Sequence, residues 1–373
     1  MNRLGLMTMA TVSSMVAFSL AAVGAAEFTY TTWVVPAETT VVKGMAPYFK
    51  RVEEETGGEF KGKIFTAGQV LGQAATLNGI RDRVVDSGFA LEGWAAKEMP
   101  YNALIADIQY VNISPIAASA ASAETYFFKC PECRAEYDRY NVFAMGGHSI
   151  DVNYLMCTKE LRSLDDIKAL RIRAPLRIYR DLVNTFGATP VFTSFPEMVP
   201  ALQTGQAHCT VGNTSWMNAY GLKDMMKSIV TTRFAGALPT HGLFVVNKAA
   251  WSGLSPKVKA SLARHFPAVM VDSTLAYTGD GKAGIDAAVA AGVKKIDLGE
   301  PFAKKWDEFM ADEPERIFKV AVANGVKLEA AKRIHADYVE IYKRWEAFAQ
   351  SVNFDNAKIT KELVDRVYSK VQF

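Results

Sequence analysis

The chain has 373 residues, more than one ordinary hydrophobic core accommodates, so two lobes are expected. Hydrophobic residues make up 50% of it, which excludes a disordered chain. The formal charge of +3 gives no basis for binding nucleic acid or an anionic membrane surface.

Residues 1–26 have the pattern of a secretory signal peptide. Arg3 supplies the basic start, an apolar segment follows at about 9–23, and Gly-Ala-Ala at 24–26 fits a small-residue cleavage site. A membrane anchor is disfavoured because the segment is short and ends in small residues. Export to the periplasm and cleavage are therefore predicted.

The next part of the chain alternates strands with helices. Strands are predicted at 28–35, 64–66 and 87–91, with helices at 42–56 and 73–85 between them. This order implies a parallel sheet with right-handed crossovers.

A second such half begins near residue 142, and its clearest part is 170–216. Strands are predicted at 170–173, 191–195 and 207–211, with a helix at 176–186 and another that begins at Ser194, which has capping-box spacing to Glu197, and ends near Gly205. Ligands of such sheets bind beyond the carboxyl ends of the strands. Arg173 and Asn213 are expected there.

A strand at 243–247 is predicted to return to the first lobe, and helices follow at 256–290 and 301–350. The apolar stripe of 301–350 predicts packing rather than a site.

Four cysteines, at 130, 133, 157 and 209, can form disulfides in an exported chain. Cys-Pro-Glu-Cys at 130–133 resembles a redox motif or half a zinc site, but no second pair or spaced histidine ligands accompany it. A structural disulfide is therefore favoured there, and no metal or cofactor is expected. Cys157 and Cys209 are expected either to pair or to stay as buried thiols.

Several motifs in a fixed order resemble the DctP-type solute-binding proteins, the periplasmic receptors of tripartite ATP-independent periplasmic (TRAP) transporters. The motifs are Ala-Gly-Gln-Val-Leu-Gly at 67–72, Leu-Arg-Ile-Arg-Ala-Pro at 170–175, Phe-Gly-Ala-Thr-Pro-Val at 186–191, Glu197 with Ala-Leu-Gln-Thr-Gly at 201–205, and Val-Val-Asn-Lys-Ala-Ala-Trp at 245–251.

The resemblance implies a two-lobed α/β periplasmic-binding-protein fold with largely parallel sheets, a ligand cleft between the lobes and a helical C-terminal region. Lobe I is placed at 27–147 and 236–275, and lobe II at 148–235 and 276–373. The resemblance also implies one long helix across both lobes at 256–290. The glycines at 279, 281 and 284 argue against its continuity.

The resemblance assigns the arginine of the 170–175 motif, Arg173, to a bidentate clamp on a ligand carboxylate. The alternative for Arg173 is a salt bridge with a nearby acid. Arg171 is expected to have a structural partner. Asn213 is the matching amide, or else it forms only an Asx-turn.

The remaining predicted ligand contacts are aromatic residues and one acid. They follow strand ends or lie close to the motifs: Trp33, Phe89, Glu92, Trp94, Tyr154 and Trp216. Tyr154 lies near where many relatives carry a second arginine, and none occurs between Arg139 and Arg162. A monocarboxylate with an apolar or cationic remainder is therefore favoured over a dicarboxylate.

The sequence therefore predicts a monomeric periplasmic receptor that delivers an organic acid to the small and large TRAP membrane subunits. No Gly-x-Ser-x-Gly, His-Glu-x-x-His or Walker motif occurs. The alternatives are a periplasmic enzyme acting on a carboxylate, with His148 or His241 as base, and a receptor serving a sensor kinase.

Overall fold

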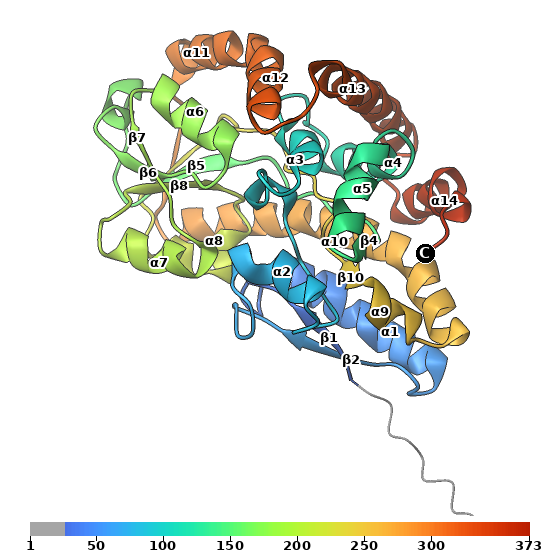
Figure 1. The fold of residues 1–373 in the computed structure, drawn as a ribbon. Coiled ribbons are helices and arrows are strands. Elements are labelled where there is room, and N and C mark those ends of the chain that lie inside the picture. Colours follow the sequence, from blue (N-terminus) through green and yellow to red (C-terminus); the bar gives the residue numbers. More distant parts are fainter. Residues whose placement is uncertain (1–26) are drawn as a thin grey trace, which may run out of the picture.

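The computed structural model describes residues 27–373, so the predicted signal peptide lies outside the described residues. Two β-sheets, each covered by helices, form two lobes, and this confirms the predicted α/β architecture (Figure 1). Within the described part of the chain, no helix is both long and apolar enough to cross a membrane.

The sheet of the first lobe has five strands in the order β2-β1-β3-β10-β4. Its first three strands are parallel, as predicted, and β10 runs antiparallel to both β3 and β4. The strands are β1 (Glu27–Thr31), β2 (Lys61–Phe65), β3 (Ser87–Gly88), β4 (Val142–Ala144) and β10 (Val245–Asn247).

Helices cover this sheet and fill the segment between β3 and β4. They are α1 (Ala46–Thr56), α2 (Thr76–Arg81), α3 (Pro100–Asp107), α4 (Pro115–Phe128), α5 (Pro131–Arg139) and α9 (Lys248–Ser252). A π-helical turn, Thr40–Met45, precedes α1. The helix predicted at 73–85 ends early, at Arg81, because Arg83 has a left-handed backbone with φ of 59° that a helix cannot continue.

The sheet of the second lobe has six strands in the order β11-β9-β5-β8-β6-β7. The predicted strand at 170–173 is β6 (Arg171–Arg173), and it runs parallel to both of its neighbours. The other strands are β5 (Tyr154–Cys157), β7 (Thr189–Val191), β8 (Cys209–Gly212), β9 (Ser228–Val230) and β11 (Lys294–Ile296).

The helices of this lobe follow the predicted order. They are α6 (Arg177–Thr185), α7 (Phe195–Gln203) and α8 (Trp216–Ala219). The capping box at Ser194 is confirmed, since its backbone N–H donates to Glu197 Oε2 at 2.9 Å. The strand predicted at 191–195 is β7 instead and ends at Val191, because residues from Phe195 onward belong to α7.

The helix α10 (Pro256–Ala290) is continuous over 35 residues, so the expected interruption at the glycines is wrong. It contacts α1 of the first lobe and α8 of the second. A Cβ at Gly284 would lie 2.1 Å from the backbone oxygen of Thr214, and Thr214 Oγ1 donates to the Gly281 carbonyl at 3.0 Å. The glycines therefore let the helix approach the turn after β8.

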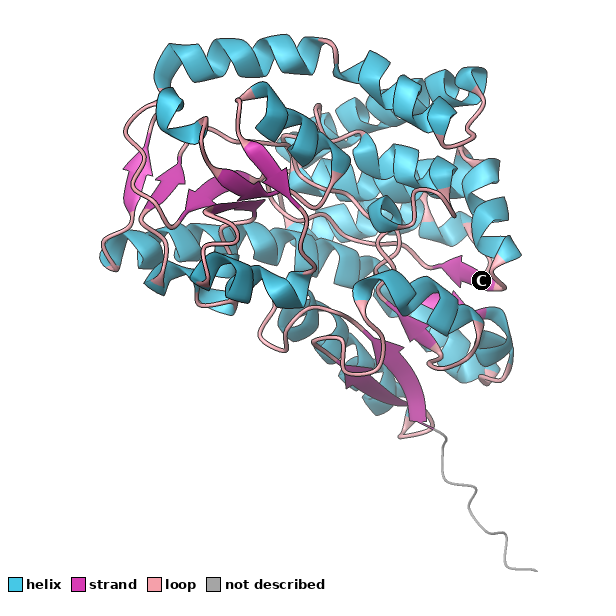
Figure 2. Ribbon diagram, turned by 60° about the vertical axis from the view of Figure 1, so that its left-hand side comes forward, coloured by secondary structure: helices cyan, strands magenta, loops and turns pink. Residues whose placement is uncertain are grey.

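Three further helices follow α11 (Gly299–Ala311) along one side of the molecule: α12 (Glu313–Ala323), α13 (Leu328–Ser351) and α14 (Asn356–Arg366) (Figures 1 and 2). The sequence places them with lobe II. In the structure α11 lies against α6, whereas α13 packs along α4 and α14 against α10. Their apolar stripes are buried, as predicted for packing surfaces.

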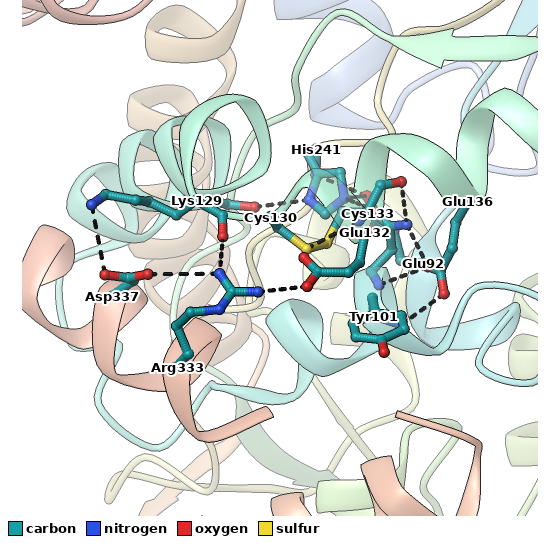
Figure 3. Close-up of a disulfide and its surroundings, with 12 residues drawn as sticks. Glu92, Tyr101, Lys129, Cys130, Glu132, Cys133, Glu136, His241, Arg333 and Asp337 are labelled. Carbon is teal, nitrogen blue, oxygen red and sulfur yellow. Dashed lines mark hydrogen bonds and ion pairs between the residues drawn. A yellow bond between two sulfur atoms is a disulfide. The ribbon is translucent and has the colours of Figure 1, made fainter. Parts of the chain in front are cut away.

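Both cysteine pairs form disulfides. Cys157 and Cys209 lie opposite each other on the antiparallel strands β5 and β8. Cys130 and Cys133 lie at the start of α5 and are fully buried, and Arg333 of α13 forms an ion pair with Glu132 at 2.7 Å (Figure 3). This burial fits the structural role predicted for the 130–133 motif.

We expect Gly284→Ala to lower the free energy of unfolding by about 1–3 kcal/mol, because the added methyl group collides with the Thr214 carbonyl and forces α10 away. Gly279→Ala is the matched control in the same helix. A Cβ there meets nothing within 4 Å, so this variant should gain up to about 1 kcal/mol of helix propensity. Urea unfolding measures both, and equal stabilities would contradict the close approach.

Candidate functional site

A cavity lies between the two lobes, with about 570 Å³ of space between protein atoms, mouth included. Both lobes, the segments that join them and α10 contribute its walls: Trp33, Val34, Glu38, Phe89, Leu91, Trp94, His148, Ile150, Asn153, Pro175, Leu176, Tyr179, Phe195, Val211, Trp216, Leu238, Thr240 and Tyr277.

Arg173 ends β6 next to this cavity and is fully buried. Its Nε donates to Thr193 Oγ1 at 3.0 Å, but Nη1 and Nη2 have no hydrogen-bond partner among residues 27–373. The salt bridge considered for Arg173 is therefore absent from the described structure. Burial lowers the pKa of the guanidinium to about 10, so it still carries its charge at neutral pH.

Arg173 lies behind the cavity lining, against Phe195. The guanidinium carbon lies 4.6 Å from the centre of the Phe195 ring, and that ring lines the cavity. Arg171, at the other end of β6, is exposed and donates from Nε to the Gln206 carbonyl at 2.9 Å. The two arginines thus face different surroundings, and Arg171 has the structural partner that was predicted.

Asn213 follows β8 and is fully buried. Its Oδ1 accepts a hydrogen bond from the Ser215 backbone N–H at 2.8 Å, which is the Asx-turn considered as the alternative role. Its Nδ2 has no partner within the described residues. The side chain therefore forms the turn and still has a free donor.

Four of the predicted aromatic residues come together on the cavity. The ring of Trp33 lies 5.1 Å from Phe89, 4.5 Å from Trp94 and 4.6 Å from Phe195 between ring centres, and Phe195 lies 5.0 Å from Trp216. The Nε1 atoms of Trp33 and Trp94 have no hydrogen-bond partner in residues 27–373. The wall is aromatic but has unused N–H donors.

Trp216 fits only because residue 212 is glycine. A Cβ at Gly212 would lie 1.8 Å from Cζ3 of Trp216. The end of β8 therefore has room for the indole, which packs against it and faces the cavity.

Four of the predicted contacts are not among the residues that line the cavity: Arg173, Asn213, Glu92 and Tyr154. Glu92 is fully buried and accepts hydrogen bonds from Thr240 Oγ1 at 2.8 Å and from the His241 backbone N–H at 2.9 Å. Tyr154 lies in β5 opposite Gly212. Glu92 thus joins η3 (Glu92–Trp94) to the segment before β10, and its hydrogen bonds there are structural.

Several lining residues were not predicted from the sequence, and Glu38 is the most consequential. It is a buried acid that accepts from the Thr40 backbone N–H at 2.8 Å and also from the hydroxyl groups of Thr40 and Tyr277. Burial raises the pKa of Glu38. Its position five residues after Trp33 was the only available signal, because Tyr277 is distant in the sequence.

The two histidines considered as bases differ in position. His148 lines the cavity, stacks on Tyr277 at 5.5 Å between ring centres, and has no partner for Nδ1 in the described chain. His241 is buried away from the cavity, with Nε2 2.6 Å from Asn102 Oδ1 (Figure 3). The two therefore do not form one catalytic group.

Two lobes joined by crossing segments, with a cavity between them, are the architecture of receptors that bind small ligands. The chain belongs to the DctP family: the model for bacterial extracellular solute-binding protein, family 7, matches residues 32–320.

Solved structures of this fold agree with the assignment. A marine metagenome TRAP solute-binding protein specific for aromatic acid ligands, in complex with meta-hydroxyphenylacetate, has 18% identity and a TM-score of 0.75, over 85% of this chain and 98% of that one. A Rhodoferax ferrireducens TRAP protein with benzoate has 18% identity and a TM-score of 0.72, over 85% and 98% of the two chains. One from Bordetella bronchiseptica with mandelate has 16% identity and a TM-score of 0.69, over 84% and 99%.

Burial lowers the pKa of His148 from 6.5 to about 3, so the ring is neutral in the folded protein near pH 7. Between those two pKa values the unfolded chain binds the proton more readily, so stability falls as the pH falls from about 6.5 towards 3. When the pH is lowered from 7 to 5, the free energy of unfolding should therefore fall by about 2 kcal/mol less in His148→Gln than in the wild type. Urea unfolding at both pH values tests this, and an equal loss would show that folded His148 accepts the proton.

Proposed function

We propose that the protein is a periplasmic receptor that binds a small organic acid by its carboxylate, closes over it and delivers it to TRAP membrane subunits. The observation that supports this most directly is the buried guanidinium of Arg173, whose Nη1 and Nη2 have no partner in the described residues. A buried charge without a partner is costly. A ligand carboxylate offers two oxygens in the geometry that a guanidinium fork matches.

Asn213 completes the anion site in this proposal. Its Nδ2 is a buried donor without a partner, and a carboxylate has lone pairs for more than two donors. The carboxylate reaches Arg173 past the ring of Phe195, which contacts both the guanidinium and the cavity.

The rest of the ligand is small and largely apolar, because Trp33, Phe89, Trp94 and Trp216 line the cavity. The chain has no arginine between Arg139 and Arg162, so a second carboxylate clamp of the kind found in relatives is missing. The aromatic acids, benzoate and mandelate bound by solved proteins of this fold are acids of this type. We assign no ligand contact to Glu92 or Tyr154.

The geometry around Arg177 supports closure over the ligand. Its Nε donates to Asp107 of α3 at 2.8 Å, and its other nitrogens pair with Asp181 and Glu313. Leu176, the residue before it, lines the cavity. An ion pair between α6 and α3 therefore joins the two lobes directly beside the site.

Catalysis is the less favoured alternative, because His148 has no acid or nucleophile hydrogen-bonded to it among the described residues. An acid that binds should occupy one site per protein molecule, and it should be chemically unchanged after incubation. The sensor-kinase alternative differs only in the partner that receives the closed protein.

We expect Arg173→Ala to weaken binding by about 2–5 kcal/mol, the usual cost of removing one member of a buried charge pair. Arg173→Lys should recover only part of this loss, because the ammonium keeps the charge without the fork. A thermal-shift screen with benzoate, 3-hydroxybenzoate, mandelate, pyroglutamate and galacturonate identifies the acid, and calorimetric titration measures the variants.

Arg171→Ala is the matched control from the same strand and should leave affinity nearly unchanged, because that side chain bonds to the 205–208 segment. If Arg171→Ala abolishes binding while Arg173→Ala retains it, the assignment of the anion site is wrong.

Closure predicts a smaller radius of gyration in small-angle scattering when the acid is added at saturation. Asp107→Asn weakens the ion pair between α3 and α6 and therefore the closed form. It should reduce the affinity for the acid several-fold, although Asp107 is not assigned a contact with the ligand. A scattering profile that does not change at saturation would contradict a closing mechanism.

A further inference from the structure

Among residues 27–373, Glu38 is the one buried acid that lines the cavity, and no Lys, Arg or His of these residues forms an ion pair with it. The hydrogen bonds that Glu38 accepts all come from neutral groups, namely the backbone N–H and hydroxyl of Thr40 and the hydroxyl of Tyr277. The other charge that acts on it is a second carboxylate, Asp280. A carboxylate ligand neutralises Arg173 but leaves Glu38 without a counter-charge.

A continuous aromatic surface connects the two charged ends. From Arg173 it passes through Phe195 and Trp33 to Phe89, and then through His148 to Tyr277, which donates to Glu38. Neighbouring ring centres along it lie 4.6–5.5 Å apart. The faces of Trp, Tyr and Phe attract cations, most strongly where water is excluded.

Glu38 and Phe195, the ring beside Arg173, line the same cavity, so both charged ends border one space. Burial and the charge of Glu38 raise the pKa of the Tyr220 hydroxyl, and Arg173 acts on it in the opposite direction. The Tyr220 ring also lies 6.0 Å from Trp216 and 6.1 Å from Phe195 between centres.

We propose that the ligand is a zwitterion, with its carboxylate at Arg173 and a positively charged nitrogen at Glu38, held between the aromatic walls. This inference rests on the proposed carboxylate receptor and narrows its ligand class to small amino acids, amidines or betaines. In such a complex both buried charges of the cavity have a partner, and the ligand enters with no net charge.

The test uses three acids of one shape: 3-(aminomethyl)benzoate, 3-(hydroxymethyl)benzoate and 3-methylbenzoate, titrated by calorimetry. A second pair, L-proline and cyclopentanecarboxylate, tests a shorter separation between the carboxylate and the positive charge. We expect the charged member of at least one set to bind at least tenfold more tightly than its uncharged relatives. Equal or tighter binding of the uncharged acids, including the hydroxymethyl acid, overturns the proposal.

Glu38→Gln should abolish this preference, because an amide keeps the shape and removes the charge, and the measured quantity is the ratio of the affinities for the charged and uncharged acids. Glu92→Gln is the matched control, since Glu92 is also a buried acid of the first lobe but does not line the cavity. It should keep the preference for the charged acid. A preference that survives in Glu38→Gln overturns the assignment of the cation end.

The two proposals fail in different ways. If uncharged acids bind and the charged ones do not, the carboxylate receptor stands and the zwitterion inference is wrong. If no acid of any set or of the earlier screen binds, the proposed function itself is wrong.

Discussion

The contact between α10 and the turn after β8 connects the lobes to the site. Thr214 places its backbone oxygen against Gly284 and its hydroxyl on the carbonyl of Gly281. Asn213 and Trp216 belong to the same turn and the helix that follows it. Because α10 also contacts α1 of the first lobe, the helix that spans both lobes holds Asn213 and Trp216 in place.

The site contains buried hydrogen-bond donors that have no acceptor among the described residues. Buried donors normally have partners. Within residues 27–373, donors without a partner occur on Arg173, Asn213, Trp33 and Trp94. In the receptor that we propose, such groups destabilise the closed form in the absence of ligand and stabilise the complex once a ligand supplies acceptors. The same groups would then favour opening when the cavity is empty.

The sequence predicted the parts of this arrangement that depend on local pattern. The strand that ends at Arg173 and the capping box at Ser194 are set by residues a few positions apart, and both were found. The buried helix α4 gave no amphipathic signal because its alanine-rich surface is covered on nearly all sides.

The features that the sequence did not predict depend on distant contacts. The glycines of α10 look like helix breakers until Thr214 is seen against them. Glu92 and Glu38 both follow strands of the first lobe. Hydrogen bonds from Thr240 and His241 hold Glu92 outside the cavity lining, whereas Tyr277 holds Glu38 at the cavity. No local rule distinguishes these two acids.

The missing side chain at residue 212 has a consequence for how such a receptor changes its ligand. Trp216 occupies the space that any Cβ at Gly212 would fill, so the position of the indole depends on the glycine at residue 212. A change there would narrow or reshape the cavity while Arg173 and Asn213 stay as they are. A substitution at position 212 can therefore change which acids the receptor accepts without a change in any residue that contacts the ligand. This makes position 212 a suitable site for redesigning specificity.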